Sequence, residues 1–210
     1  MAHETNTAAQ LAALGSATLG ESGAHRMAPR MRPVWHGATV AAPAYAVACT
    51  PGDNLAVHVS VTTAPAGSVL CVDVGDVAEL GYWGEVLTTG AEARGLAGLV
   101  IDGGVRDVAA LEAHGFPVFA AGIALPGATK ERPGVVGGRA TVGGVEVGTG
   151  DWIVGDVDGV VVVPAAQLDA VLAAGQRRSD AEARMFDALA GGSTTVDLLG
   201  LDPTPIEVVR

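Results

Sequence analysis

The chain has 210 residues, of which 49% are hydrophobic, and its 12 basic and 23 acidic side chains give a net charge of −11 at pH 7. This length suffices for one large domain with a sizeable core. The negative charge disfavours binding to nucleic acids or anionic membrane surfaces. No apolar run reaches the ~18 residues that span a bilayer, and the N-terminus lacks the basic region of a secretory signal. We therefore expect a cytoplasmic protein without nucleic-acid or membrane partners.

The first third of the chain predicts a helix followed by strands. Residues 1–36 are expected to form an N-terminal helix and arm, because leucines recur there at near-helical spacing before prolines break a basic stretch. Three apolar segments follow, at residues 38–51, 55–65 and 68–76, and turn residues separate them. Each of these three segments predicts a strand.

The middle of the chain alternates between helical and strand patterns. Helices are expected over residues 84–95 and 107–114, and each is closed by a glycine. Short apolar strands are expected over residues 99–101 and 116–119. This alternation predicts a parallel sheet over residues 68–120.

The last third combines hairpins with a long helix. Glycine and valine dominate residues 134–164, where paired glycines predict hairpin turns. Residues 165–210 are expected to form a C-terminal helical segment, because an amphipathic pattern runs through most of it. Together the elements predict a single α/β domain over residues 1–210, with a strand-rich middle and helices on the outside.

Several common types of site do not fit the residue spacing. Gly75 and Gly81 are too few for a loop that binds a nucleotide or a methyl donor. The five histidines show no zinc spacing, and no G-x-S-x-G motif is present. The single lysine, Lys130, lies in a polar, proline-bounded loop, where a solvated side chain is favoured over a Schiff-base catalyst. Cys49 and Cys71 form no C-x-x-C motif and are interpreted as buried thiols.

Potentially functional side chains are most concentrated in LVIDGGVRD, residues 99–107, where an apolar strand ends in an arginine and an aspartate. Ligands of α/β proteins gather at the carboxyl ends of strands. Arg106 offers a planar fork for a carboxylate, and Asp107 offers hard oxygens that suit Mg²⁺. The alternative is a structural Arg–Asp pair in which Asp107 caps the next helix. Spacing alone does not separate these two interpretations.

At this point the sequence resembles the RraA-like family, which includes the 4-hydroxy-4-methyl-2-oxoglutarate and 4-carboxy-4-hydroxy-2-oxoadipate aldolases. The resemblance covers most of the chain. It is carried by Pro51-Gly52-Asp53-Asn54, Gly84-Glu85-Val86-Leu87, GLAGLVIDGGVRD (residues 95–107), Pro117-Val118-Phe119-Ala120 and GDWIVGDVDGVVVVP (residues 150–164). For architecture it implies an α/β/β/α sandwich of the swivelling-domain kind, assembled as a homotrimer or hexamer with sites between subunits.

The resemblance also implies roles for individual residues. Aldolases of this family carry an acid, twenty residues, then Arg-Asp, and this frame falls on Glu85, Arg106 and Asp107. Asp107 would be the single protein ligand of Mg²⁺ or Mn²⁺. Arg106 would hold the pyruvyl carboxylate or keto oxygen, and Glu85 would act as base, directly or through a water. Glu182 would match a carboxylate that the family donates to a neighbouring subunit.

Backbone groups complete the implied site. The N–H groups that would bind the substrate carboxylate, at a helix N-terminus, belong to Gly84, Glu85, Val86 and Leu87. Three features depart from the family pattern, of which one, Thr149-Gly150-Asp151 in place of a Pro-Gly-Asp turn, is expected to be structurally neutral. The usual acid is Asp rather than Glu85, and Tyr82 and Trp83 stand where smaller residues are usual, so they are expected to reshape the substrate pocket.

The implied activity is that of a divalent-metal-dependent lyase on small 2-oxo acids. It would cleave 4-hydroxy-2-oxo-dicarboxylic acids to pyruvate and a second oxo-acid, and would decarboxylate oxaloacetate through the same pyruvate enolate. Two alternatives stay open. One is a non-catalytic, protein-binding regulator, because some family members inhibit ribonuclease assemblies. The other is a related lyase that acts on a different oxo-acid.

Overall fold

The computed structural model describes residues 2–209 and contains a ten-stranded mixed sheet and a two-stranded hairpin. The large sheet comprises β1 (His25–Arg26), β2 (Arg32–Pro33), β3 (Val40–Cys49), β4 (Val69–Asp73), β5 (Gly81–Trp83), β6 (Gly98–Val105), β7 (Val118–Ile123), β8 (Gly134–Val136), β11 (Trp152–Asp156) and β12 (Gly159–Val163). Its order is β1-β12-β11-β3-β4-β6-β7-β2, with β5 beside β6 and β8 beside β3. The hairpin pairs β9 (Arg139–Val142) with β10 (Val145–Gly148).

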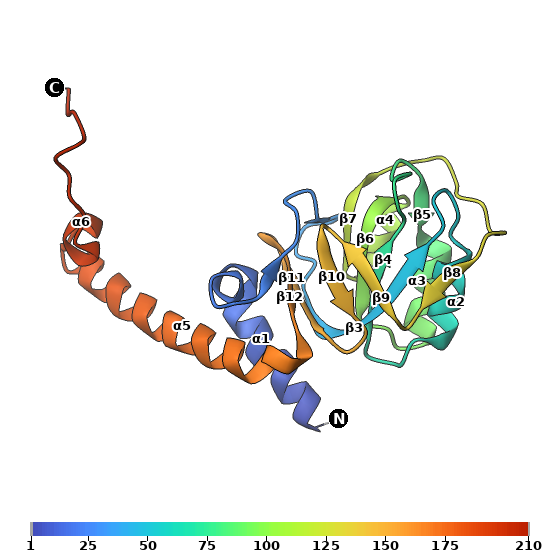
Figure 1. The fold of residues 1–210 in the computed structure, drawn as a ribbon, viewed down its shortest axis with the longest axis horizontal. Coiled ribbons are helices and arrows are strands. Elements are labelled where there is room, and N and C mark those ends of the chain that lie inside the picture. Colours follow the sequence, from blue (N-terminus) through green and yellow to red (C-terminus); the bar gives the residue numbers. More distant parts are fainter. Residues whose placement is uncertain (1, 210) are drawn as a thin grey trace.

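Helices cover both outer faces of this sheet (Figure 1). They are α1 (Ala2–Gly20), α2 (Leu55–Thr63), α3 (Glu85–Ala93), α4 (Val108–His114), α5 (Leu168–Ala190) and α6 (Thr195–Leu199), with a 3₁₀ turn at Ala165–Gln167. None of the helices in the described part of the chain combines the length and apolarity needed to cross a membrane.

The expected parallel sheet is confirmed. Strands β3, β4, β6 and β7 are parallel neighbours, and α2, α3 and α4 provide the crossovers between them. All three helices pack on one face, where Val57, Leu87 and Leu111 join the core formed with Leu70 and Leu99. Because the strands run the same way, their carboxyl ends lie along one edge together with the loops that lead into the helices.

The strand expected over residues 55–65 is wrong, because Leu55–Thr63 forms α2. The valines and threonines of this segment favour a strand by propensity. Its buried residues are nevertheless Ala56, Val57, Ser60 and Val61, which is the three-to-four spacing of one helix face. Since β3 and β4 are parallel, the chain must cross over between them, and a helix is the usual way to do so.

The second layer of the sandwich is the other half of the same sheet. The first residues of β3, Val40–Pro43, pair antiparallel with β11, and the next residues, Ala44–Ala48, pair parallel with β4. The sheet therefore curls, and its concave side is filled by an apolar cluster that the β9–β10 hairpin closes. Gly155 shows how closely the halves meet, because a Cβ there would lie 2.8 Å from Cζ of Phe119. The predicted α/β fold is confirmed, with both β layers formed by one continuous sheet.

The chain ends flank the outer face of β11 and β12. Leu11 and Leu19 of α1 and Val171 of α5 bury against these strands. Only Val171 and Gly175 of the 23-residue α5 are buried, and beyond them the helix leaves the body and leads to α6 (Figure 1). We call the segment 176–209 the C-terminal arm. Its exposed apolar side chains include Phe186 and Leu199.

Candidate functional site

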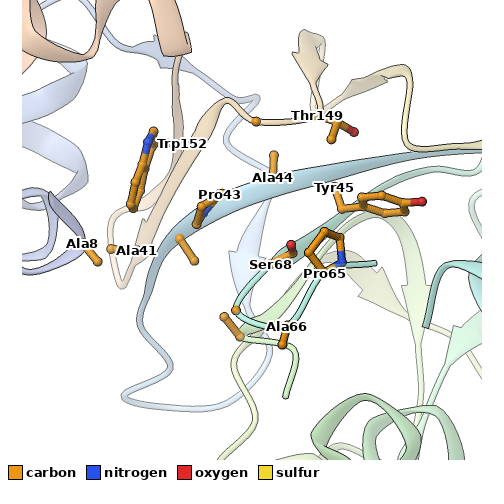
Figure 2. Close-up of a pocket in the computed structure, with 14 residues that line it drawn as sticks. Ala8, Ala41, Pro43, Ala44, Tyr45, Pro65, Ala66, Ser68, Thr149 and Trp152 are labelled. Carbon is orange, nitrogen blue, oxygen red and sulfur yellow. The ribbon is translucent and has the colours of Figure 1, made fainter. Parts of the chain in front are cut away.

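One cavity is apolar and is lined by no charged side chain. It measures about 610 Å³ and lies between α1, β3 and the loop before β4 (Figure 2). Its lining is mostly alanine, proline and glycine, with Trp152 at one end. Of its polar side chains, Tyr45 bonds Thr63 through its hydroxyl at 3.2 Å, and Thr149 Oγ1 accepts from the Ala46 N–H at 3.0 Å. This cavity therefore holds no charged group that would attract an organic acid.

A second cavity, of about 250 Å³, brings together the residues that carry chemistry. It lies at the carboxyl ends of β5 and β6 and at the N-terminus of α3. It is lined by Asn54, His58, Gly81, Tyr82, Trp83, Gly84, Val86, Leu87, Arg106, Asp107, Gly127, Ala128 and Lys130. Asp107 is the only carboxylate in this set, whereas Arg106 and Lys130 are both cations. The charged side chains of the lining thus sum to +1, which suits an anionic ligand.

Arg106 and Asp107 leave β6 in an unusual backbone conformation. The Arg106 N–H donates to the Trp83 carbonyl at 2.9 Å, which holds the strand end in place. Asp107 has φ of 59°, the only positive φ of a non-glycine residue in the described chain. Such strained positions are concentrated at functional sites.

The side chain of Asp107 does not cap the helix that it precedes. It occupies the N-cap position of α4 without a side-chain capping bond. Instead, its Oδ2 accepts the Glu85 N–H, the first of α3, at 3.1 Å. Arg106 Nε lies 3.8 Å from the same oxygen, too far for a hydrogen bond, and its guanidinium bonds no other described residue. Of the structural alternative, the Arg106–Asp107 ion pair is therefore present, at 3.8 Å, but the helix cap is not.

The backbone of α3 adds donors to the cavity. The first intrahelical bond runs from the Thr88 N–H to the Gly84 carbonyl at 3.1 Å, so the N–H groups of Val86 and Leu87 have no helical partner. Both residues line the cavity. Gly84 allows Asp107 to approach, because a Cβ at position 84 would overlap Asp107 Oδ2. A helix N-terminus with free N–H groups beside a cation attracts carboxylates.

Two predicted site residues lie apart from this arrangement. Glu85 does not line the cavity; its carboxylate is 57% exposed and lies 3.7 Å from His114 Nε2, while His114 Nδ1 bonds Glu92 at 2.8 Å. Glu182 lies on the C-terminal arm, where its Oε1 accepts from Arg178 Nε at 2.9 Å. Within one chain the fold thus brings Gly84, Val86, Leu87, Arg106 and Asp107 together, but not Glu182.

The two aromatic residues next to Gly84 are part of the core. Tyr82 and Trp83 are 0% and 1% exposed, although both contribute to the cavity wall. The Tyr82 hydroxyl donates to the Val77 carbonyl and accepts the Gly52 N–H. The Trp83 ring stacks on Phe116 with centroids 6.1 Å apart, and its Nε1 donates to Thr88 Oγ1 at 2.7 Å. Their rings therefore anchor the site floor rather than fill the substrate space.

Three polar residues of this cavity, Asn54, His58 and Lys130, are not predicted as site residues from the sequence. Asn54 is buried and donates from Nδ2 to the Tyr82 carbonyl at 2.8 Å, while its Oδ1 has no partner. Burial, aided by the charge of Lys130, lowers the pKa of His58, so the imidazole is neutral at neutral pH. Lys130 is exposed, as predicted, but it faces the site, with Nζ 3.3 Å from the Ala128 carbonyl. The lone lysine was the signal that could have found this group.

Comparisons with known proteins match this chain over most of its length. The sequence model of the family described as "RraA-like: Aldolase/RraA" matches residues 12–162. A protein of Halalkalibacterium halodurans named "Putative 4-hydroxy-4-methyl-2-oxoglutarate aldolase" is 36% identical over 155 residues, which are 73% of this chain and 74% of that protein.

Two solved structures share the fold. RraAS2 of Streptomyces coelicolor, described as an unusual member of the RNase ES inhibitor RraA protein family, has a TM-score of 0.74 at 25% identity over 86% of this chain and 95% of its own. The RNA-processing inhibitor RraA from Thermus thermophilis has a TM-score of 0.62 at 27% identity over 68% and 86%. Because the family model and the aldolase relative each span more than two thirds of the sequence, this chain belongs to the RraA-like family.

Proposed function

We propose that this protein is a divalent-metal-dependent lyase that cleaves 4-hydroxy-2-oxo-dicarboxylic acids to pyruvate and a second oxo-acid, and that also decarboxylates oxaloacetate. One observation carries the proposal: the Arg106 guanidinium, which makes no hydrogen bond to a described residue, the Asp107 carboxylate and the free N–H groups of α3 meet in one cavity. The similarity to a protein named as an aldolase supports the same class of reaction.

The donor set suits Mg²⁺ or Mn²⁺. No cluster of three or more His, Cys, Asp or Glu side chains that could hold a metal occurs in the described chain. Asp107, the only carboxylate that lines the cavity, would be the protein ligand of the ion. Mg²⁺ commonly keeps several waters and binds through one or two carboxylates plus the substrate. When bound, such an ion supplies Lewis-acid polarisation of the substrate's keto oxygen.

The protein's own groups would bind both ends of a dicarboxylate. Arg106 presents a planar fork for the carboxylate next to the keto group. The N–H groups of Val86 and Leu87 would donate further hydrogen bonds to the same carboxylate. Lys130 is distant in sequence from α3 but lines the same cavity, and it would pair with the distal carboxylate. Neutral His58 and the free Oδ1 of Asn54 would hydrogen-bond the groups between them.

Cleavage also requires a proton acceptor. As the C3–C4 bond breaks, the C4 hydroxyl loses its proton, the bond electrons enter the enolate of pyruvate, and C3 is later protonated. Glu85 is our candidate base. It begins α3 between the lining residues Gly84 and Val86, yet its carboxylate lies outside the cavity beside His114. Action through an ordered water, rather than direct contact, fits this placement.

The test measures pyruvate release from 4-hydroxy-4-methyl-2-oxoglutarate and from oxaloacetate, with Mg²⁺ and with EDTA. We expect activity that EDTA abolishes, that Asp107→Ala removes, and that Arg106→Ala lowers by about 10²–10³. The matched control is Arg94→Ala, which removes an exposed arginine at the end of α3. Its rate of pyruvate release should equal that of the wild type. Metal-independent release, or full activity of Asp107→Ala, contradicts the proposal.

A second candidate is a protein-binding regulator, and it is favoured by the likeness to two ribonuclease-inhibitor structures. The net charge of −11 suits a basic partner. In this case the well-folded protein would release no pyruvate from either substrate, and Mg²⁺ would not shift its melting temperature. The same experiment thus separates the two functions.

A further inference from the structure

Asp53 is a buried carboxylate with an unusually complete set of hydrogen bonds, close to the cavity but not lining it. It is 1% exposed. Its Oδ2 accepts from Thr129 Oγ1 at 2.7 Å, from the Glu131 N–H at 2.6 Å and from the Arg132 N–H at 3.1 Å. Its Oδ1 accepts the Leu55 N–H at 2.8 Å. Burial of a carboxylate is strongly unfavourable unless hydrogen bonds within the protein replace those it made to water, as these four do.

These bonds leave Asp53 ionised at any working pH. Burial by itself would raise the pKa of Asp53, but the hydrogen bonds from Glu131, Leu55, Thr129 and Arg132 outweigh it and lower the pKa to about 2. The carboxylate is therefore a permanent anchor rather than a titrating switch.

The donors on Oδ2 bracket one residue. Thr129 precedes Lys130, and Glu131 and Arg132 follow it, so the Asp53 carboxylate holds the backbone on both sides of the lysine. Two backbone bonds, from the Asn54 N–H to the Thr129 carbonyl and from the Thr129 N–H to the Gly52 carbonyl, both 2.9 Å, strengthen the junction. Among the described residues, the Lys130 ammonium bonds only the Ala128 carbonyl. Its position in the cavity thus depends on its backbone.

We infer that Asp53 is a positioning residue that fixes the 127–133 loop and, through it, holds Lys130 where the distal carboxylate of a dicarboxylic substrate binds. The inference rests on the proposed function for its choice of substrate. Through Leu55, at the start of α2, the same carboxylate also fixes the helix that carries His58. One buried anion thereby holds both the loop that carries Lys130 and the helix that carries His58.

The test variant is Asp53→Asn. Asparagine keeps the shape but replaces one acceptor by an NH₂ donor, which cannot accept from both the loop donors and Leu55. The matched control is Asp156→Asn. Asp156 also accepts three bonds, from the Ser16 N–H, the Ser16 hydroxyl and the Asp158 N–H, but it lies at the end of β11 and touches no loop of the site.

The first measurement does not depend on the proposed function. Because Lys130 is the only lysine of the chain, a lysine-specific protease can cut only after residue 130, giving fragments 1–130 and 131–210. Cleavage of a native protein follows local opening. We expect Asp53→Asn to be cut at least about tenfold faster than the wild type, and Asp156→Asn to be cut at a rate close to that of the wild type. Equal rates in the two variants would overturn the inference.

The second measurement is calorimetric binding, with Mg²⁺ present, of 2-oxoglutarate and of pyruvate, which lacks the distal carboxylate. Asp53→Asn should weaken the binding of 2-oxoglutarate about tenfold and should change the dissociation constant of pyruvate by less than about twofold. Lys130→Met should do the same, and the double variant should be no weaker than either single one. Equal weakening of both acids contradicts positioning through Lys130. If the wild type binds neither acid, the proposed function fails, while the cleavage rates still decide the role of Asp53.

Discussion

At the scale of single residues, the direction of one side chain decides what the Arg106–Asp107 pair can do. A left-handed backbone costs a non-glycine residue about 1–2 kcal/mol. Asp107 adopts it, and its carboxylate thereby turns from its own helix toward the first N–H of α3. One oxygen of the carboxylate is thus held by a hydrogen bond, and the other is available to a ligand. Among the described residues, Arg106 keeps only the 3.8 Å ion pair with this same carboxylate.

This arrangement makes Gly84 indispensable in a way that can be tested. The Gly84→Ala substitution introduces a Cβ that overlaps Asp107 Oδ2 and displaces the carboxylate. We expect loss of most pyruvate release and of metal binding measured by calorimetry, while circular dichroism stays that of the wild type.

Gly90→Ala is the control for that substitution, because Gly90 also lies in α3 and its Cβ would meet only Val61 Cγ1 at an ordinary 3.5 Å. Alanine inside a helix is favoured over glycine by about 0.5–1 kcal/mol. Gly90→Ala should therefore be slightly more stable and fully active. An active Gly84→Ala would show that Asp107 need not hold its present place.

At the scale of elements, the loop over residues 127–133 depends on a single buried carboxylate, and its stability should depend on pH. The ordinary pKa of an aspartate is about 3.9, and the folded pKa of Asp53 is about 2. A carboxyl whose pKa is lower in the folded state stabilises the fold fully above its unfolded pKa. The stabilisation is lost as pH falls through the folded pKa.

We therefore expect the free energy of unfolding of the wild type to exceed that of Asp53→Asn by a constant amount from about pH 5 to 7, and the gap to narrow between about pH 4 and 2. Urea unfolding followed by tryptophan fluorescence measures both proteins across this range. A gap as large at the lowest pH as at pH 7 would mean that Asp53 is not ionised in the fold.

Elements also show what a sequence can and cannot predict. The helices that begin near Glu85 and Val108, the parallel strands and the Gly-rich hairpins follow from local patterns, and all are present. The helix α2 does not, because its valine-rich composition favours a strand until the parallel pairing of β3 and β4 imposes a crossover. Local preference yields to topology there.

The site divides in the same way. Arg106 and Asp107 are adjacent in sequence, so a single motif exposes them. Asn54 and Lys130 are 76 positions apart, since 130 − 54 = 76, and their segments meet through the bridge between Asp53 and Thr129 and the hydrogen bonds of the Asp53 carboxylate. No local pattern carries that pairing. The role of Asp53 in the Pro-Gly-Asp-Asn turn was equally invisible, because burial cannot be read from a turn motif.

At the scale of the whole molecule, the C-terminal arm carries Glu182 away from the chain's own cavity (Figure 1). The exposed Phe186 and Leu199 on the arm are of the kind that a partner subunit covers. We propose that the arm lies against a neighbouring copy in a homotrimer or hexamer, and that Glu182 enters the neighbour's site.

Complementation between two inactive chains tests this proposal. Asp107→Ala retains Glu182, and Glu182→Gln retains Asp107, so a mixed trimer contains some sites with both groups. Co-expression of the two variants should restore up to about a quarter of the wild-type activity per site. Each variant alone should form trimers by light scattering but remain inactive. If the mixture shows no restored activity, either both groups belong to the site of a single chain or they do not act together in catalysis.

The long strand β3 has a consequence for how the molecule comes apart. Its first half bonds β11 and its second half bonds β4, so neither half of the curled sheet has a complete set of partners without it. A chain in which the β11–β12 half has melted exposes the concave cluster that the β4–β6 half shares. The two halves therefore lose their structure in one cooperative step. The amide hydrogens of β3, at the centre of that step, should exchange with solvent last.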